Sequence, residues 1–242
     1  MAHEHTSSSA DNSQNQLRTA LRELYADRAF AARTWRDASD HGYLGTILIE
    51  RSIALLSGRL TGELLDVGCG AQPYAGYFGH VARKRACDFN SKRGKVDFEC
   101  PADKIPLPDG TLDSILCTEV LEHVPEPLSV WREFNRLLKP GGRVLLATPM
   151  YWPSHEEPYD FYRYTEFGLR RLAQESGFEV EKLLPRGGVW AFLGQAMMHV
   201  MPRYLRFRWQ RRLVNRLALK LDAWRRNPSV TIGWTILAVK RG

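Results

Sequence analysis

The chain has 242 residues, of which 44% are hydrophobic and 25% charged, a composition typical of a globular protein with one large core. Its net charge of +7 is concentrated, because nine arginines and lysines and one acid between residues 203 and 226 give that segment +8 and leave the rest at −1. This pattern excludes a basic coat for general nucleic-acid binding. The longest apolar run, 189–201, is too short to span a membrane.

The N-terminal region divides into a tail and two helices. Residues 1–16 are polar and lack the pattern of a signal peptide, so we predict a disordered tail. Residues 17–39 and 43–57 carry apolar side chains at helical spacing. We expect these helices, within residues 17–60, to form an N-terminal cap.

Short apolar runs alternate with helical patterns from residue 63 onward. This alternation is typical of an α/β fold with a mostly parallel sheet and helices on both faces. No strand signal occurs in residues 186–231, which predicts a basic helical insertion before the last strand of one domain, 17–242. The predicted strands are 63–67, 82–89, 112–118, 142–149, 180–185 and 232–240, and the predicted helices between them are 127–138 and 166–176.

The four cysteines stand singly in the sequence. No C-x-x-C pair occurs, so neither a disulfide framework nor a zinc knuckle is predicted. Single thiols are typical of a reducing compartment, and we expect the cytoplasm.

A glycine turn follows the first predicted strand. Ligands of open parallel sheets bind beyond the carboxyl ends of the strands, where glycine lets the backbone approach them. Asp66, Gly68 and Gly70 occupy that place, and Asp88 closes the second strand at the spacing of an acid that holds ribose hydroxyls. The pattern predicts an adenosine-type ligand.

The next residues restrict which adenosine ligand fits. A dinucleotide turn has a third glycine where this chain has Pro73, which offers no amide to a phosphate. The lysine of a P-loop is also absent. A ligand with ribose and adenine but no phosphate fits better, and S-adenosylmethionine is such a ligand.

Residues 63–178 resemble the class I S-adenosylmethionine-dependent methyltransferases, in the branch that includes the ubiquinone and menaquinone biosynthesis methyltransferases. The matching stretches are LLDVGCG (64–70), Asp88, ADKIPLPDGTLDSILCTEVLEHV (102–124) and FNRLLKPGGRVLLATP (134–149). The resemblance implies a Rossmann-like seven-stranded sheet with an antiparallel last strand. It also implies S-adenosyl-L-methionine as the cofactor.

The resemblance assigns cofactor contacts by position. It places Asp66, Gly68 and Gly70 at the methionine end and Asp88 at the ribose. It places Ala102 and Asp103 at the adenine and Thr118 and Glu119 along the cofactor, with residues 121–124 continuing the wall. Two positions depart from the family, Gln72 at its third glycine and Pro101 where it often has an acid.

The loop after the fifth predicted strand, residues 151–165, is rich in titratable and aromatic side chains. We predict His155 as a general base, because the pKa of histidine suits proton removal near neutrality. Asp160 or Glu157 would orient it, and Arg163 would hold an acidic acceptor. The alternative is that Asp160 and Arg163 pair to lock the loop. No metal site is predicted.

The methyl acceptor is restricted by an absence from the sequence. The Asp/Asn-Pro-Pro-aromatic tetrapeptide of base-modifying amino-methyltransferases is replaced by Cys-Thr-Glu-Val at 117–120. Nucleic-acid amines are therefore disfavoured, and oxygen or carbon of a small metabolite, sugar or lipid-linked acceptor remains. The alternatives are a methyltransferase-like binding module without activity, and an NAD or nucleotide-sugar oxidoreductase.

The basic segment 203–226 contains an amphipathic pattern at 208–224, in which the apolar side chains share one face. Three interpretations remain open. The helix is a lid packed on the sheet edge, an interfacial helix on an anionic membrane, or a binding stripe for RNA or another polyanion. The apolar side chains in question are Leu213, Val214, Leu217, Leu221 and Trp224.

Overall fold

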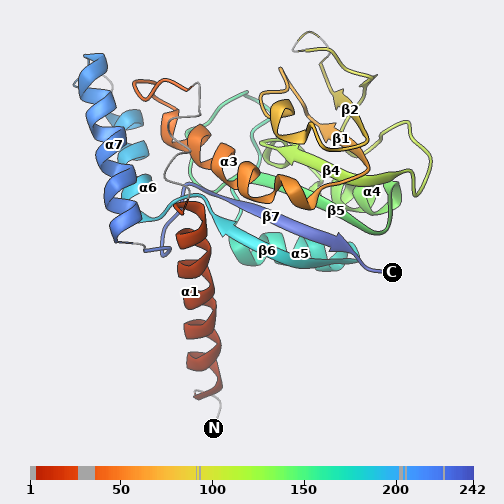
Figure 1. Ribbon diagram of the computed structural model, residues 1–242, viewed down its shortest axis with the longest axis horizontal. Coiled ribbons are helices and arrows are strands. Elements are labelled where there is room, and N and C mark those ends of the chain that lie inside the picture. Colours follow the sequence, from red (N-terminus) through yellow and green to blue (C-terminus); the bar gives the residue numbers. More distant parts are fainter. Residues whose placement is uncertain are drawn as a thin grey trace. The chain divides into compact units, whose positions relative to one another are not determined.

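The computed structural model describes residues 4–26, 36–90, 92, 94–201, 204, 206–225 and 227–242, with side chains from Gln14 onward. The chain divides into two compact units, each of which is described by itself. One unit combines residues 1–52 with 184–233, and the other combines 53–183 with 234–242 (Figure 1).

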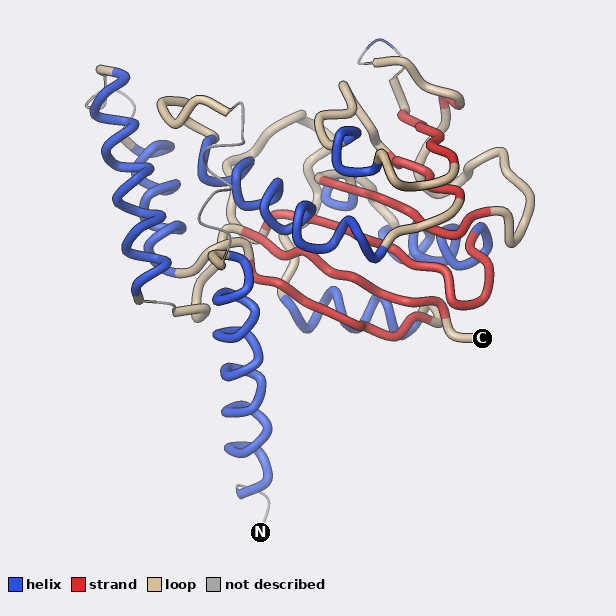
Figure 2. The backbone as a smooth tube through the Cα atoms, viewed as in Figure 1, coloured by secondary structure: helices blue, strands red, loops and turns tan. Residues whose placement is uncertain are grey.

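The second unit is built on a seven-stranded sheet in the order β3-β2-β1-β4-β5-β7-β6 (Figure 2). The pairs β1–β2, β1–β4, β2–β3 and β4–β5 are parallel. The strands are β1 (Glu63–Val67), β2 (Arg83–Asp88), β3 (Phe98–Glu99), β4 (Leu112–Thr118), β5 (Leu138–Pro149), β6 (Phe178–Pro185) and β7 (Gly233–Lys240).

The last strand, β7, lies between β5 and β6 and runs against β6. The amide of Arg241 after β7 donates to the carbonyl of Gly177 before β6, whereas the amide of Arg186 after β6 donates to Gly233 at the start of β7. Such crossed ends occur only between antiparallel neighbours. The predicted fold, a mostly parallel sheet with an antiparallel last strand, is confirmed.

β2, β6 and β7 differ from their predicted bounds by one or two residues at an end, and two strands differ in a more informative way. β3 was not predicted, because a strand of two residues is too short to show alternation. β5 begins at Leu138 instead of residue 142, because Leu138 already pairs with Leu112 across a register shift and Gly141 has a φ of +75°. Gly141 and Gly142 therefore lie inside β5, at an irregularity in its pairing with β4, and do not separate the helix from the strand.

Helices α4 (Pro127–Leu137) and α5 (Glu166–Glu175) connect the strands β4 to β5 and β5 to β6. α4 turns a stripe into the core, where Val130, Trp131 and Phe134 are fully buried. Their spacing of one, three and four residues is that of a single helical face, so burial of this face anchors the helix. The 3₁₀ turns η1 (Ser57–Arg59), η2 (Ala75–Phe78) and η4 (Leu121–His123) complete this unit.

The first unit is helical and contains α1 (Glu4–Leu24), most of α3 (Tyr43–Leu56), α6 (Val189–Val200) and α7 (Arg208–Trp224). α1 includes residues that the sequence analysis assigns to a disordered tail, and it ends at Leu24 instead of residue 39. Of the predicted helix 17–39, residues 27–35 lie outside the described part. The described part of the insertion 186–231 contains the helices α6 and α7, which pack together.

Candidate active site

Glycine shapes the turn that follows β1. Gly68 has a φ of +64°, and a Cβ at this position would lie 2.1 Å from Cγ2 of Val120. The amides of Gly68 and Cys69 both donate to the carbonyl of Cys87 in β2, at 2.8 and 3.1 Å. Only glycine combines this left-handed backbone with so close a neighbour. The turn is therefore held both by its glycine and by the adjacent strand.

The second strand brings its terminal acid to this turn. The amide of Gly70 donates to Oδ2 of Asp88 at 2.9 Å, and the amide of Asn90 donates to Oδ1 of the same carboxylate at 2.9 Å. Gly94 approaches closely as well, since a Cβ there would lie 2.2 Å from the Gly70 carbonyl oxygen. The structure thus joins Gly70 and Asp88, two residues that the sequence assigns to one ligand.

The acid of the first strand, Asp66, lies in the same place. Burial raises the pKa of Asp66 to about 7, and the negative charge of Asp88 contributes to the rise. Two carboxylates this close in a poorly solvated site favour a positively charged ligand, because a cation stabilises their ionised forms. The two carboxylates therefore fit a ligand that carries a cation next to a ribose.

The remaining predicted cofactor residues lie on neighbouring elements. β4 ends at Thr118, and Glu119 follows with a φ of +53° and donates its amide to the carbonyl of Ala147 in β5. Ala102 and Asp103 lie in the turn after β3, where Ser129 at the start of α4 donates to the Asp103 carboxylate at 3.2 Å. Glu119 is thus fixed at the strand ends, whereas Asp103 is exposed and bonded to a helix.

Gln72 occupies the position of the family's third glycine. Its φ is +53°, a left-handed conformation that glycine adopts most readily. The amide of Gln72 donates to Cys69, and its side chain donates to the carbonyl of Lys95 at 2.6 Å. The chain therefore keeps a left-handed backbone here and holds it with a side-chain hydrogen bond.

The loop 151–165 is fastened to the turn after β4. The amides of Phe161 and Tyr162 donate to the carbonyl of Glu122 at 2.9 and 3.3 Å. The buried hydroxyl of Tyr164 donates to the carbonyl of Leu121 at 2.9 Å, so this tyrosine packs the loop as well. These contacts place the loop at the carboxyl ends of β4 and β5, the edge that also carries Glu119.

His155 lies on this loop beside His123. Their rings meet edge to face with centroids 4.7 Å apart. Nδ1 of His155 is 3.2 Å from the carbonyl of Pro153 and 3.4 Å from Oδ2 of Asp160. Because a carbonyl only accepts, this geometry assigns the proton to Nδ1 and leaves the lone pair of Nε2 available. Asp160 therefore contacts His155 in the position that an orienting acid would need.

Asp160 and Arg163 form a two-pronged ion pair, with N–O distances of 2.6 and 2.8 Å. Arg163 also donates to the carbonyl of Trp152 through Nε and Nη2. The guanidinium holds the pKa of Asp160 well below its usual range, and Asp160 raises the pKa of Arg163. This arrangement supports the interpretation in which the pair locks the loop.

Glu122, His123 and His155 form a cluster. Sequence spacing does not reveal it, because His155 is distant in the sequence from residues 121–124, which are predicted to lie near the cofactor. One ligand atom from each lies within 4.8 Å of the others. His123 Nδ1 is 2.7 Å from the Tyr159 carbonyl, which directs Nε2 toward Oε1 of the buried Glu122 at 3.8 Å. Two imidazoles and a carboxylate suit a divalent metal. Within the described ranges, this cluster is the place where a metal could be held.

The cysteines near the strand ends are unsuited to covalent chemistry. All four thiols are free, and Cys69 and Cys117 are buried. Burial raises the pKa of Cys69 to about 12 and raises that of Cys117 well above its usual range. Thiols in this state remain protonated and are poor nucleophiles.

Comparison with known proteins supports the assignment from the site. Residues 65–146 match the family model of a methyltransferase domain. The chain is 35% identical over 144 residues to a ubiquinone biosynthesis O-methyltransferase of Bordetella avium, covering 52% of this chain and 60% of the relative. It is 35% identical over 102 residues to the enzyme of that name from Aliivibrio fischeri, covering 36% and 43%. The chain thus spans at most about three fifths of the length of these relatives.

Solved structures share the fold at low sequence identity. A SAM-dependent methyltransferase from Archaeoglobus fulgidus has a TM-score of 0.54 at 16% identity, with 80% of this chain and 93% of that chain covered. The [4+2]-cyclase SpnF has a TM-score of 0.54 at 20% identity, with 79% and 80% covered. At these identities, the likeness concerns the fold alone.

The fold is an α/β domain with a sheet in the order β3-β2-β1-β4-β5-β7-β6, and its candidate ligand site lies at the carboxyl ends of the parallel strands. The chain contains a methyltransferase domain at residues 65–146, and it shares its fold with a SAM-dependent methyltransferase. The resemblance in LLDVGCG and the stretches that follow it is therefore confirmed.

Proposed function

We propose that this protein transfers a methyl group from S-adenosyl-L-methionine to oxygen or carbon of a small metabolite, sugar or lipid-linked acceptor. One observation carries the proposal: the Gly70 amide and Asp88 meet beside Asp66, whose pKa is raised to about 7. When bound, the cofactor supplies an electrophilic methyl group on a cationic sulfur. Asp88 would accept hydrogen bonds from the ribose hydroxyls, and Asp66 would lie near the cationic methionine end.

The loop 151–165 would position the acceptor and remove its proton. Nε2 of His155 is the free base of this loop, and a hydroxyl within hydrogen-bond reach of it would lose its proton as the methyl group arrives. Tyr159, Phe161 and Tyr162 are exposed on the same loop and offer an aromatic wall. The relatives' name, O-methyltransferase, favours oxygen as the acceptor atom.

The residues around the base would hold it in place. Asp160 contacts His155, and Arg163 keeps Asp160 charged and oriented. In this proposal, Asp160 and Arg163 are positioning residues for the loop. Methyl transfer is an in-line displacement, so orientation of the acceptor and exclusion of water are the main contributions of the protein.

We propose the cytoplasm as the site of action and residues 17–242 as one functional domain. Among the described residues, no helix is long and apolar enough to cross a membrane. Contact of the segment 203–226 with an anionic membrane is a separate proposal, which rests on the charge and the apolar side chains of that segment.

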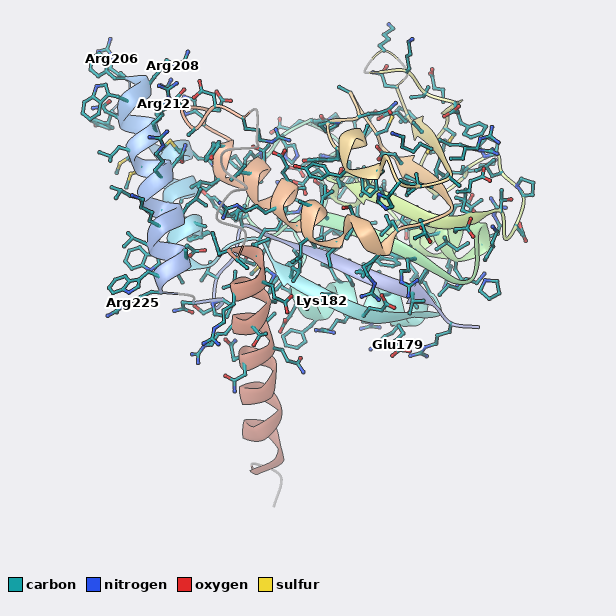
Figure 3. The ribbon with its side chains drawn as sticks, viewed as in Figure 1. Glu179, Lys182, Arg206, Arg208, Arg212 and Arg225 are labelled. Atoms are coloured by element: carbon teal, nitrogen blue, oxygen red, sulfur yellow. The ribbon has the colours of Figure 1, made fainter. Side chains whose placement is uncertain are left out.

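Cofactor binding is tested by isothermal titration with S-adenosylmethionine and with its demethylated product. Asp88→Ala should weaken both affinities at least tenfold, because it removes the carboxylate that would accept from the ribose hydroxyls and that holds the Gly70 amide. The matched control is Glu179→Gln, an exposed carboxylate at the start of β6 that is labelled in Figure 3. Absence of binding by the unaltered protein would refute the proposal.

The base is tested by methyl transfer from labelled cofactor to cell extract. His155→Gln should lower the rate by about a hundredfold or more without changing cofactor affinity. The exposed His41→Gln serves as the matched control. Loss of activity on chelation, with restoration by Zn²⁺ or Mg²⁺, would instead assign His155 to a metal site.

A second candidate is a module that keeps the fold without methyl transfer. The shared fold of a [4+2]-cyclase is consistent with this candidate, because one fold can serve several chemistries. Tight cofactor binding without transfer to any acceptor in the extract would support this candidate. Binding of NAD in the same titration would support an oxidoreductase, although Pro73 offers no amide to a pyrophosphate.

A further inference from the structure

Helix α7 buries its polar face. Asn215 and Asp222 are fully buried, and Ala218 between them is 6% exposed. These residues are three and four positions apart, so they form one side of the helix. The side-chain amide of Asn215 donates to the carbonyls of Ala38 and Asp40 at 2.9 and 3.3 Å. Polar contacts therefore determine which face of α7 points inward.

Asp222 fixes α7 against the N-terminus of α6. Its carboxylate accepts hydrogen bonds from the amides of Gly188, Trp190 and Ala191 at 2.7, 3.1 and 3.3 Å. The hydroxyl of Tyr25 donates to the same carboxylate at 2.8 Å. A buried carboxylate with four donors at a helix N-terminus is strongly localised. Rotation of α7 would break this network.

Helix α6 is held in the same manner. The side chain of Gln195 is buried, accepts from the amide of Gly45 at 3.1 Å and donates to the carbonyl of His41 at 2.8 Å. Gly194 lies against α7, since a Cβ there would be 2.6 Å from Cβ of Ala218. The inward face of α6 thus combines the small residues Ala191 and Gly194 and the polar Gln195 with one large apolar side chain, Met198.

The apolar side chains consequently face outward. Leu213, Leu217 and Trp224, which the sequence places on one apolar face, are 50%, 47% and 70% exposed. Within the helical unit, the packed face of α7 is therefore not the face that carries these three residues. Of the sixteen large hydrophobic side chains exposed in the described part, ten lie in the α6–α7 hairpin. The ten are Leu193, Met197, Val200, Met201, Tyr204, Phe207, Trp209, Leu213, Leu217 and Trp224.

Basic side chains flank this apolar surface. Arg216 and Lys220 are exposed and lie one helical turn from Leu213, Leu217 and Trp224. Figure 3 shows Arg206, Arg208 and Arg212 at one end of α7 and Arg225 at the other. Arg208 and Arg212 pair with Asp37, and the guanidinium of Arg225 lies 5.0 Å from the centre of the Trp224 ring.

We propose that the exposed surface of the α6–α7 hairpin binds the headgroup layer of an anionic lipid bilayer. Tryptophan, leucine and methionine would enter the boundary between headgroups and acyl chains, and the flanking cations would contact lipid phosphates. A second copy fits less well, because a symmetric contact would bring the same cations together. A nucleic acid fits less well, because the centre of the surface is apolar.

This proposal does not depend on methyl transfer and is tested by vesicle sedimentation of the full chain. The protein should sediment with vesicles of phosphatidylcholine containing 30% phosphatidylglycerol, and at least tenfold less with phosphatidylcholine alone. Tryptophan fluorescence should shift to the blue on binding and be quenched by brominated acyl chains. Equal binding to both vesicles, or binding to neither, would overturn the proposal.

Two sets of variants separate the apolar and electrostatic contributions. Trp209→Ser with Leu213→Ser and Leu217→Ser should reduce partitioning by about tenfold or more, because these side chains would no longer enter the interface. Phe89→Ser with Phe167→Ser, at exposed positions of the other unit, is the matched control. Circular dichroism should show that both sets fold, since every altered side chain is exposed.

The charge set replaces Arg216 and Lys220 with glutamine, and its matched control replaces the exposed Arg83 and Arg132 with glutamine. The first pair should weaken binding to anionic vesicles several-fold, and the control pair should not. Two results would overturn the proposal in favour of another occupant. One is self-association, in the absence of lipid, that the serine variants abolish. The other is salt-sensitive RNA binding that the serine variants leave intact.

Discussion

The carboxyl group of Asp66 should couple cofactor binding to proton release. In the ligand-free protein, burial and the charge of Asp88 raise the pKa of Asp66 to about 7. A cationic ligand beside this carboxylate should return its pKa toward the ordinary value of 3.8. At pH 6, about 0.9 proton would then leave the protein for each ligand bound.

The same shift sets the pH dependence of affinity. If the pKa falls from about 7 to its ordinary value on binding, the dissociation constant should decrease about fifteenfold between pH 5.5 and pH 7.0. The amino group of the cofactor stays protonated over this range, so Asp66 accounts for the change. Calorimetry in buffers of different ionisation enthalpy measures both the affinity and the proton count.

Stability provides an independent measurement of the same carboxylate. A raised pKa in the folded state means that folding is penalised as pH rises from the ordinary value of 3.8 through about 7. Asp66→Asn cannot ionise, so it should stabilise the ligand-free protein by about 4 kcal/mol at pH 8. At pH 5 the gain should be smaller by about 2–3 kcal/mol. Urea denaturation at the two pH values measures this difference.

Asp66→Asn should therefore bind the cofactor more weakly while it gains stability. Glu179→Gln, which removes an exposed carboxylate from β6, should retain the proton release and the affinity of the unaltered protein. A dissociation constant that is flat between pH 5.5 and pH 7.0, with no proton released, would refute the reasoning.

Three further changes test the turn, the loop and the helical unit. Gly68→Ala should destabilise the protein by about 2 kcal/mol or more in urea denaturation, because the new Cβ would meet Val120. The matched control is Gly110→Ala, which also has a positive φ, +61°, but open space around it. This control should lose only about 1 kcal/mol. Arg163→Gln should lower kcat without changing cofactor affinity, because it releases Asp160 and the carbonyl of Trp152. A loss of cofactor affinity in calorimetry would contradict the role of Arg163 in positioning the loop. Asp222→Ala should destabilise the helical unit by about 2–4 kcal/mol, because three amides and the Tyr25 hydroxyl lose their acceptor. Ala223→Ser, on the neighbouring face of the helix, should change stability by less than about 1 kcal/mol.

The order of local signals in the sequence was sufficient for most of the sheet and for gathering the predicted cofactor residues at one edge of it. Strand–turn–helix alternation determines a mostly parallel sheet, and parallel strands place their carboxyl ends at one edge. Asp66, Gly68 and Asp88 could therefore be assigned together before their contacts were known. Such residues are predictable because each follows directly from the end of a strand.

Contacts between distant loops were decided by the tertiary structure. Sequence spacing does not bring His123 to His155, since this pairing depends on how residues 151–165 fold back onto the turn after β4. β3 was also missed, because two residues carry no detectable periodicity.

The orientation of α7 shows most clearly the difference between what the sequence determines and what the tertiary structure decides. Its amphipathic pattern determines that a helix forms and that its apolar side chains share a face. It does not determine which face is buried, because an apolar stripe and a hydrogen-bonded polar stripe can each serve as the packed side. The carbonyls of Ala38 and Asp40 and the amides at the start of α6 select Asn215 and Asp222 for burial. These partners come from distant parts of the chain, so only the folded structure could direct the apolar face outward.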